Sequence, residues 1–187
     1  MADKKIRSAL IIGGARSGKS NFAQELALKM PQPVLFVATA EAGDEEMRQR
    51  IEIHKRARPD TWQTIEATTL VSDQIQLEIG AIPTVIVDCI TLLINNVFNK
   101  FLNSAGELDD PSLVEIAVMA EISSLVDCIK QAEARFIVVT NEVGQGLVPT
   151  NNMSRLYRDL IGKANQILSQ NTDDVYIMIA GLPIKVK

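Results

Sequence analysis

Histidine, cysteine and aromatic residues are scarce in this chain of 187 residues. It contains one His, two Cys, one Trp, two Tyr and five Phe. Cys89 and Cys128 lie far apart in apolar settings, which is not the pattern of a disulfide scaffold or a zinc site, so we expect buried, reduced thiols. Because aromatic side chains are few, the core must be built mainly from Val, Ile, Leu, Ala and Met.

Long apolar runs and excess positive charge are missing as well. No segment approaches the roughly 20 apolar residues of a membrane span, and the short apolar run at 6–12 leads into a glycine-rich loop rather than a signal-peptide cleavage site. The formal net charge of −4 argues against a nucleic-acid surface, which needs a basic field. We therefore expect one cytoplasmic domain over residues 1–187 that acts on a small molecule.

What is present is a complete phosphate-binding loop after the apolar run 9–12. The sequence fills every fixed position of the pattern G-x-x-x-x-G-K-[ST] with Gly13, Gly14, Ala15, Arg16, Ser17, Gly18, Lys19 and Ser20. The glycines let backbone N–H groups wrap a phosphate at the start of a helix. We expect Lys19 to reach the β- and γ-phosphates and the Ser20 hydroxyl to bind Mg²⁺. A chance match is the alternative, and the flanking strand and helix patterns disfavour it.

Strand and helix patterns alternate along the rest of the chain. Continuous apolar runs predict buried parallel strands at 34–38, 84–88, 136–140 and 175–180, with a short strand at 61–66 and an edge strand at 182–187. Apolar periodicity predicts helices at 21–30, from Asp44 onward, and at 68–79, 90–102, 112–132 and 153–168. This order indicates an α/β fold of the P-loop NTPase (RecA-like) type, with a mostly parallel sheet and helices on both faces.

Polar residues follow the predicted strands at the edge where such sheets bind ligands. Asp88 ends one strand and is interpreted as a Walker-B-type acid that binds Mg²⁺ together with Ser20; the alternative is that it caps the next helix. The loop 141–149 is expected to touch substrate or nucleotide, or else to be a plain crossover in which Asn141 and Glu142 serve as caps. Both alternatives stay open for each feature.

The only histidine, His54, lies on the helix predicted after Asp44. It falls near an apolar stripe that includes Met47 and Ile51, so a packed structural role is one interpretation. The same stretch carries five cations that could neutralise a polyphosphate brought to the imidazole, or could simply form a solvated face: Arg48, Arg50, Lys55, Arg56 and Arg58. The helix from Ile90 has more apolar residues than a surface helix needs, which suggests a subunit contact.

Together these segments resemble the bifunctional adenosylcobinamide kinase/adenosylcobinamide-phosphate guanylyltransferases of cobalamin biosynthesis. The resemblance extends over nearly the whole chain and rests on the phosphate loop, residues 44–51, His54-Lys55, Arg58-Pro59, Trp62, Glu66, Cys89-Ile90-Thr91, Thr140 through Gly144, and Val148-Pro149. The loop alone occurs in many unrelated proteins. The combination with the histidine helix and Thr-Asn-Glu-Val-Gly is far more specific.

The resemblance implies two reactions. A nucleoside triphosphate, ATP or GTP, phosphorylates adenosylcobinamide, and GMP is then transferred from GTP to that phosphate through a guanylylated histidine that matches His54. It also implies Mg²⁺, a homo-oligomer that is a trimer in the family, and nucleotide contacts at residues 13–20, Thr39, Ala40, Glu41, Lys55, Arg56, Ala57, Arg58, Glu66 and Asp88. Catalytic roles fall to His54 and Lys19.

Other functions use the same loop. A single-activity small-molecule kinase would move only the γ-phosphate, and a P-loop ATPase or GTP-controlled binding module would leave His54 as packing. An interaction protein with a degenerate site is disfavoured because every fixed loop position is intact. Pyrophosphate release from GTP in the presence of adenosylcobinamide phosphate distinguishes these alternatives.

Overall fold

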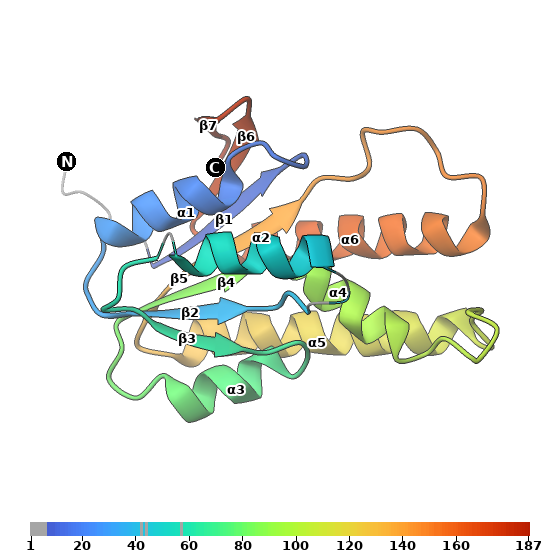
Figure 1. Ribbon diagram of the computed structural model, residues 1–187, viewed down its shortest axis with the longest axis horizontal. Coiled ribbons are helices and arrows are strands. Elements are labelled where there is room, and N and C mark those ends of the chain that lie inside the picture. The colour runs from blue at the N-terminus through green and yellow to red at the C-terminus, as the bar shows by residue number, and fades with distance from the viewer. Residues whose placement is uncertain (1–6, 42, 44, 57) are drawn as a thin grey trace.

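The computed structural model describes residues 7–41, 43, 45–56 and 58–187, and its centre is a seven-stranded sheet (Figure 1). The strand order is β3-β2-β4-β5-β1-β6-β7, and only the β6–β7 pair is antiparallel. The strands are β1 (Ser8–Gly13), β2 (Val34–Ala38), β3 (Gln63–Glu66), β4 (Thr84–Asp88), β5 (Arg135–Asn141), β6 (Asp174–Ile179) and β7 (Leu182–Lys185).

Helices cover both faces of this sheet. On one face lie α1 (Lys19–Leu28) and α2 (Glu45–Arg56), and on the other lie α3 (Val71–Glu78), α4 (Ile90–Asn99), α5 (Pro111–Gln131) and α6 (Asn152–Asn171) (Figure 1). The described residues thus form one mostly parallel α/β domain. The fold class predicted from the alternating patterns is confirmed.

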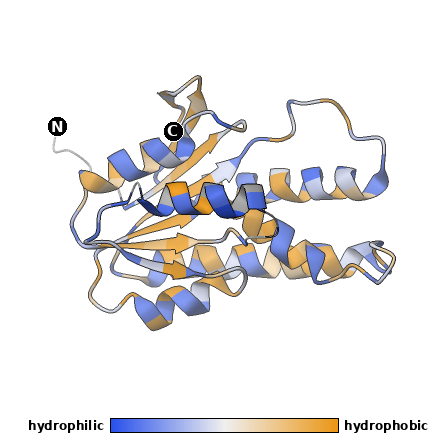
Figure 2. Cartoon of the chain, in the orientation of Figure 1, coloured by the Kyte–Doolittle hydropathy of each residue, from blue (hydrophilic) through white to orange (hydrophobic). Residues whose placement is uncertain are grey.

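Two apolar layers hold the helices to the sheet. The larger layer packs α3, α4, α5 and α6 against one face, and the smaller packs α1 against the other and includes Trp62, which is 7% exposed. Strand β2, which is buried along its whole length, is coloured hydrophobic in Figure 2, as expected where both faces of a strand are covered. Cys89 and Cys128 are free and buried, as predicted.

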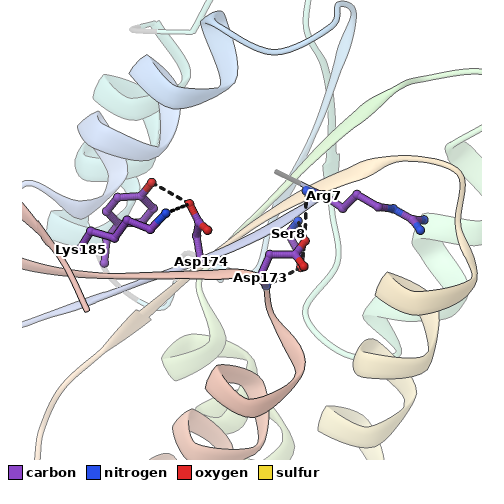
Figure 3. Close-up of polar contacts among 6 residues, drawn as sticks. Arg7, Ser8, Asp173, Asp174 and Lys185 are labelled. Carbon is purple, nitrogen blue, oxygen red and sulfur yellow. Dashed lines mark hydrogen bonds and ion pairs between the residues drawn. The ribbon is translucent and has the colours of Figure 1, made fainter. Parts of the chain in front are cut away.

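Two neighbouring aspartates anchor the last strands: Asp173 contacts the start of β1, and Asp174 joins β6 to β7. The carboxylate of Asp173 accepts hydrogen bonds from the backbone N–H groups of Arg7 and Ser8 at 3.1 and 3.0 Å, just where β1 begins (Figure 3). Asp174 accepts a hydrogen bond from the Tyr176 hydroxyl at 3.0 Å and pairs with the Lys185 ammonium at 2.8 Å. The β6–β7 hairpin, which includes the predicted edge strand, is therefore anchored by polar contacts at the amino end of the sheet.

Helix α3 begins later than its apolar pattern predicts. Leu70 takes a left-handed conformation with φ 51°, so the helix starts at Val71 rather than at Thr68. The carboxylate of Glu121, on α5, accepts hydrogen bonds from the N–H groups of Leu70 and Val71 at 3.1 and 2.8 Å. A side chain distant in sequence supplies the cap that local residues lack.

The apolar excess of α4 also has an internal explanation. Its residues Ile90, Leu93, Ile94, Val97 and Phe98 are 0 to 6% exposed within this single chain, because α4 is packed between the sheet, α5 and α6. The composition of α4 therefore does not require the subunit contact suggested from the sequence. Within the described part of the chain, no helix combines the length and apolarity needed to cross a membrane.

Candidate active site

The phosphate-binding loop joins β1 to α1 at the carboxyl edge of the sheet. Gly13 lies so close to β6 that a Cβ there would stand 2.7 Å from the Met178 carbonyl oxygen, and Gly18 has φ +93°, so both positions need glycine. Between them, the Ser17 hydroxyl is buried and has no hydrogen-bond partner among the described residues. A buried polar atom without a partner is the expected state of a group that binds a ligand.

Lys19 occupies the first position of α1 and is 8% exposed. Its ammonium donates a hydrogen bond to the Gly14 carbonyl at 2.7 Å. Burial lowers the pKa of Lys19, and the nearby charge of Asp88 opposes that effect. The ammonium is thus partly desolvated and sits against the loop that would hold phosphates.

A cavity of about 530 Å³ opens beside this loop. Six parts of the chain supply its walls: the loop and start of α1, strand β2 with the residues after it, helix α2, the residue Arg58, the carboxyl ends of β4 and β5, and the first turn of α4. The lining residues are Ala15, Arg16, Ser17, Gly18, Lys19, Ser20, Asn21, Phe36, Ala38, Ala40, Ile51, Arg58, Asp88, Cys89, Leu92 and Asn141. This volume falls within the range of small-molecule sites.

Arg58 brings a second cation into the cavity wall. Its guanidinium lies 3.6 Å from the centre of the Phe36 ring, and one of its N–H groups reaches the Thr64 hydroxyl at 3.5 Å. Burial lowers the pKa of Arg58, while the charges of Asp88 and Glu66 raise it. Stacking on an aromatic face fixes the guanidinium plane, which suits an arginine that binds phosphate.

The predicted site residues fall into three groups. Ala15 through Ser20, Ala40, Arg58 and Asp88 line the same cavity. Gly13 and Gly14 belong to the phosphate loop but do not line the cavity. Thr39 is fully buried, and its hydroxyl donates a hydrogen bond to the Cys89 carbonyl and accepts one from the Cys89 N–H, both at 2.7 Å. Glu41, Lys55, Arg56 and Glu66 do not line the cavity, and Lys55 pairs with Glu66 at 2.6 Å.

The histidine helix is only partly described. The backbone of His54 lies in α2, one turn after the cavity-lining residue Ile51, and its side chain is outside the described part of the structure. Asp44, predicted as the helix cap, and Ala57, predicted as a nucleotide contact, lie outside the described residues.

Several cavity residues were not singled out from the sequence. Phe36 and Leu92 are apolar residues with no local signal, because only the sheet order places them beside the loop. Asn141 did carry a signal, since it ends a buried strand at the ligand-binding edge. Glu142, in contrast, accepts a hydrogen bond from the Gly144 N–H within its own loop, at 2.5 Å.

The oxygen donors of the cavity fit Mg²⁺ bound together with a nucleotide. The Ser20 hydroxyl and Asp88 carboxylate line the same space, and Mg²⁺ commonly takes one or two protein oxygens while phosphates and water fill its other positions. Among the residues that the structure describes, no group of three or more His, Cys, Asp or Glu side chains is placed to hold a metal. The two oxygen donors Ser20 and Asp88 suit a metal whose other ligands are phosphate oxygens and water.

Comparison with known proteins decides the family. The family described as cobinamide kinase / cobinamide phosphate guanyltransferase matches residues 9–186. The chain belongs to this family. It is 36% identical to the bifunctional adenosylcobalamin biosynthesis protein CobU of Escherichia coli (strain K12) over 182 residues, which cover 95% of this chain and 98% of that protein. It is also 36% identical to the corresponding protein CobP of Pseudomonas aeruginosa over 178 residues, 95% of this chain and 96% of that one.

A solved structure shares the fold. An ATPase from the type III secretion system of pathogenic bacteria superimposes with a TM-score of 0.53 over 91% of this chain and 50% of that one, at 13% identity. The chain therefore spans about half the length of that ATPase. The likeness supports the P-loop NTPase-like architecture predicted for this member of the cobinamide kinase/guanyltransferase family.

Proposed function

We propose that this protein phosphorylates adenosylcobinamide with ATP or GTP and then transfers GMP from GTP to the new phosphate, through a guanylyl group on His54. The products of the second reaction are adenosylcobinamide-GDP and pyrophosphate. The observation that carries the proposal is a single cavity lined both by the phosphate loop and by residues of the segment that bears His54, namely Ile51 and Arg58. Family membership supports both activities.

The kinase step uses the loop and its lysine. The loop N–H groups and Lys19 bind the phosphates of the triphosphate, and the substrate hydroxyl oxygen attacks the γ-phosphorus. A P–O bond forms to the hydroxyl oxygen, which gives up its proton to solvent. The bond from the γ-phosphorus to the β–γ bridging oxygen breaks, and the nucleoside diphosphate leaves. Lys19 and Arg58 supply positive charge on the lining of the same cavity.

The guanylyltransfer step needs a nucleophile at the α-phosphorus. A neutral imidazole has one ring nitrogen with a free lone pair, which can attack the α-phosphorus, forming a P–N bond as pyrophosphate leaves. The phosphate of adenosylcobinamide phosphate then attacks the same phosphorus and releases the imidazole. Positions 51 and 54 are three apart in α2, a spacing that places two residues on one helical face, and Ile51 lines the cavity.

The proposal includes a metal and an assembly. When bound, Mg²⁺ held by Ser20 and Asp88 would neutralise charge on the β- and γ-phosphates. Glu41, Lys55, Arg56, Ala57 and Glu66 would complete the nucleotide contacts, as the family resemblance implies, in a homo-oligomer, a trimer by the same resemblance. A cytoplasmic location fits two buried cysteines that form no disulfide.

The deciding experiment is covalent labelling with GTP radioactive at the α-phosphate. We expect label in the unmodified protein, stable to alkali and labile to acid as a P–N bond should be, and none in His54→Ala. Gln49→Ala is the matched control, because Gln49 is exposed on the same helix and lies outside the cavity. Undiminished labelling of His54→Ala would refute the histidine assignment.

A second measurement separates the two reactions. With adenosylcobinamide phosphate and GTP present, the proposed enzyme releases pyrophosphate, whereas a single-activity kinase does not. Phosphorylation of adenosylcobinamide without any pyrophosphate release from GTP would show that the protein has only the kinase activity.

A further inference from the structure

Asn141 is a cavity residue whose backbone is fixed from two sides. Its N–H donates to the Thr91 hydroxyl on α4 at 2.9 Å, and its carbonyl accepts from the side-chain amide of Asn165 on α6 at 3.0 Å. The Asn165 amide is itself oriented by the Thr140 hydroxyl, 2.7 Å from its oxygen. Side chains from two helices therefore hold the main chain of one residue at the end of β5.

These contacts leave the carboxamide of Asn141 to the cavity. Asn141 lines the same space as the phosphate loop, and among the described residues its side-chain amide makes no hydrogen bond. The alternative interpretation, in which the Asn141 side chain serves as a cap, is therefore not supported, since a capping amide would form a hydrogen bond with nearby backbone. Loop capping is performed instead by Glu142, which accepts from the Gly144 N–H.

The sheet order tells which part of a nucleotide this amide would meet. Strand β5 lies between β1, which leads into the phosphate loop, and β4, which ends at Asp88. Asn141 is in register with Gly13 on β1, and Asp88 is in register with Val139, two residues earlier on β5. In phosphate-loop sites, the loop lysine and a metal-binding acid both act on the β- and γ-phosphates. Because β5 lies between the strand that leads to the lysine and the strand that ends at the acid, its carboxyl end should lie beside the terminal phosphate.

We infer that the Asn141 carboxamide donates a hydrogen bond to the terminal phosphate of a bound triphosphate, and that Thr91 and Asn165 position it for this contact. The inference rests on the proposed function only in requiring that a nucleotide binds at the phosphate loop. The protein then distinguishes a triphosphate from a diphosphate by a contact that the diphosphate cannot make. A neutral amide suits this role, because a carboxylate at the same place would repel the phosphate.

The test compares two nucleotides by titration calorimetry in the presence of Mg²⁺: the non-hydrolysable guanosine 5′-(β,γ-imido)triphosphate and GDP. A hydrogen bond to a charged group corresponds to a change in affinity of roughly tenfold to a hundredfold. We expect Asn141→Ala to lose about that factor for the triphosphate analogue while its GDP affinity stays unchanged. Asn141→Asp, which keeps the size of the side chain, is expected to lose more than the alanine variant.

Two further variants separate positioning from general damage. Thr91→Val removes the acceptor of the Asn141 N–H and should lower triphosphate affinity in the same direction by a smaller factor, again without changing GDP affinity. Asn99→Ala makes the same substitution as Asn141→Ala at an exposed site of α4 and should change neither affinity.

The outcomes are distinct. If Asn141→Ala binds the analogue as the unmodified protein does, or loses GDP affinity equally, the inference is overturned while the proposed function stands. If the unmodified protein binds neither nucleotide, both fail. Should Asn141→Ala not fold, the ratio of the two affinities in Asn141→Asp and Thr91→Val decides, and an unchanged ratio in both overturns the inference.

Discussion

The close approach of β1 and β6 at the phosphate loop predicts that even the change Gly13→Ala destabilises the protein. A Cβ at this position would stand 2.6 Å from the Ser17 hydroxyl oxygen, 2.7 Å from the Met178 carbonyl oxygen and 3.1 Å from the Met178 Cβ. Ser17 could rotate away. The carbonyl cannot, because Gly13 and Met178 are paired neighbours in adjacent parallel strands.

The expected loss of stability follows from that contact. Overpacking a fitted site costs about 1–3 kcal/mol, and the lower entropy of the unfolded alanine chain offsets about 0.4–1 kcal/mol of it. The net loss is roughly 1–2 kcal/mol, which for a domain of this size lowers the melting temperature by about 2–8 °C. At Gly14 a Cβ would meet nothing within 4 Å, so Gly14→Ala is the matched control and should stay within about 0.5 kcal/mol of the unmodified protein.

The assay is thermal unfolding of the three proteins without nucleotide, by calorimetry or dye fluorescence. Omitting the nucleotide matters, because ligand binding would add its own stabilisation to any variant that still binds. Equal melting temperatures for Gly13→Ala and the unmodified protein would refute the packing argument. So would a loss in Gly14→Ala as large as that in Gly13→Ala.

Two further predictions concern the lysine and the thiols. Lys19→Ala should weaken binding of a GTP analogue by roughly a hundredfold in titration calorimetry, because a partly desolvated ammonium is lost from the phosphate loop. The control is Lys29→Ala, at the exposed far end of the same helix, which should leave the affinity unchanged. Unchanged affinity in Lys19→Ala would contradict the assignment of the site. Burial raises the pKa of Cys89 to about 12, so its thiolate is scarce throughout pH 7–10. Iodoacetamide should therefore modify Cys89 slowly over this whole range in the folded protein and readily after denaturation; rapid native alkylation that rises with pH as for an ordinary thiol would show that Cys89 is exposed.

The buried strands were predictable because each consists mainly of consecutive apolar residues. The runs 34–38 and 84–88 coincide with β2 and β4 at both ends, since a parallel strand covered on both faces is apolar along its whole length. The start of α3 was not predictable, because its cap comes from Glu121 about fifty residues later. Local patterns thus define elements whose limits are set locally and miss those set by distant contacts.

The interpretation of α4 shows the same limit, namely that a local sequence pattern does not show tertiary contacts. A pattern of apolar residues indicates that a helix face is buried, but not whether the same chain or another subunit covers it. The larger layer of this domain holds four helices, and α4 lies beneath two of them, so its second apolar face is covered by α5 and α6. The oligomeric state stays a prediction of the family resemblance, without support from this helix.

For the site, the phosphate loop could be recognised because its function depends on backbone geometry that a short sequence encodes. In the opposite wall, Arg58 was predicted by the family resemblance, but its contact with Phe36 could not be predicted, since the two residues come from different segments that are brought together by the pairing of β2 with β3. Asn141 lies between these cases: its position at a strand end indicated a ligand-binding role, but the contacts with Thr91 and Asn165 that fix its main chain are tertiary.

The charge balance of the cavity explains how an acidic protein binds a polyphosphate. The whole chain has a formal net charge of −4, yet the charged residues that line the cavity are Arg16, Lys19 and Arg58 against Asp88. Burial lowers the pKa of both Lys19 and Arg58, while the charge of Asp88 raises both pKa values and the charge of Glu66 also raises that of Arg58. Each cation is therefore held in a partly desolvated place. The cations on the cavity lining would stabilise the negative charge of a bound triphosphate. The overall charge therefore argues against an extended nucleic-acid partner and not against a nucleotide, because over the length of a triphosphate the charges of the cavity outweigh those of the distant surface.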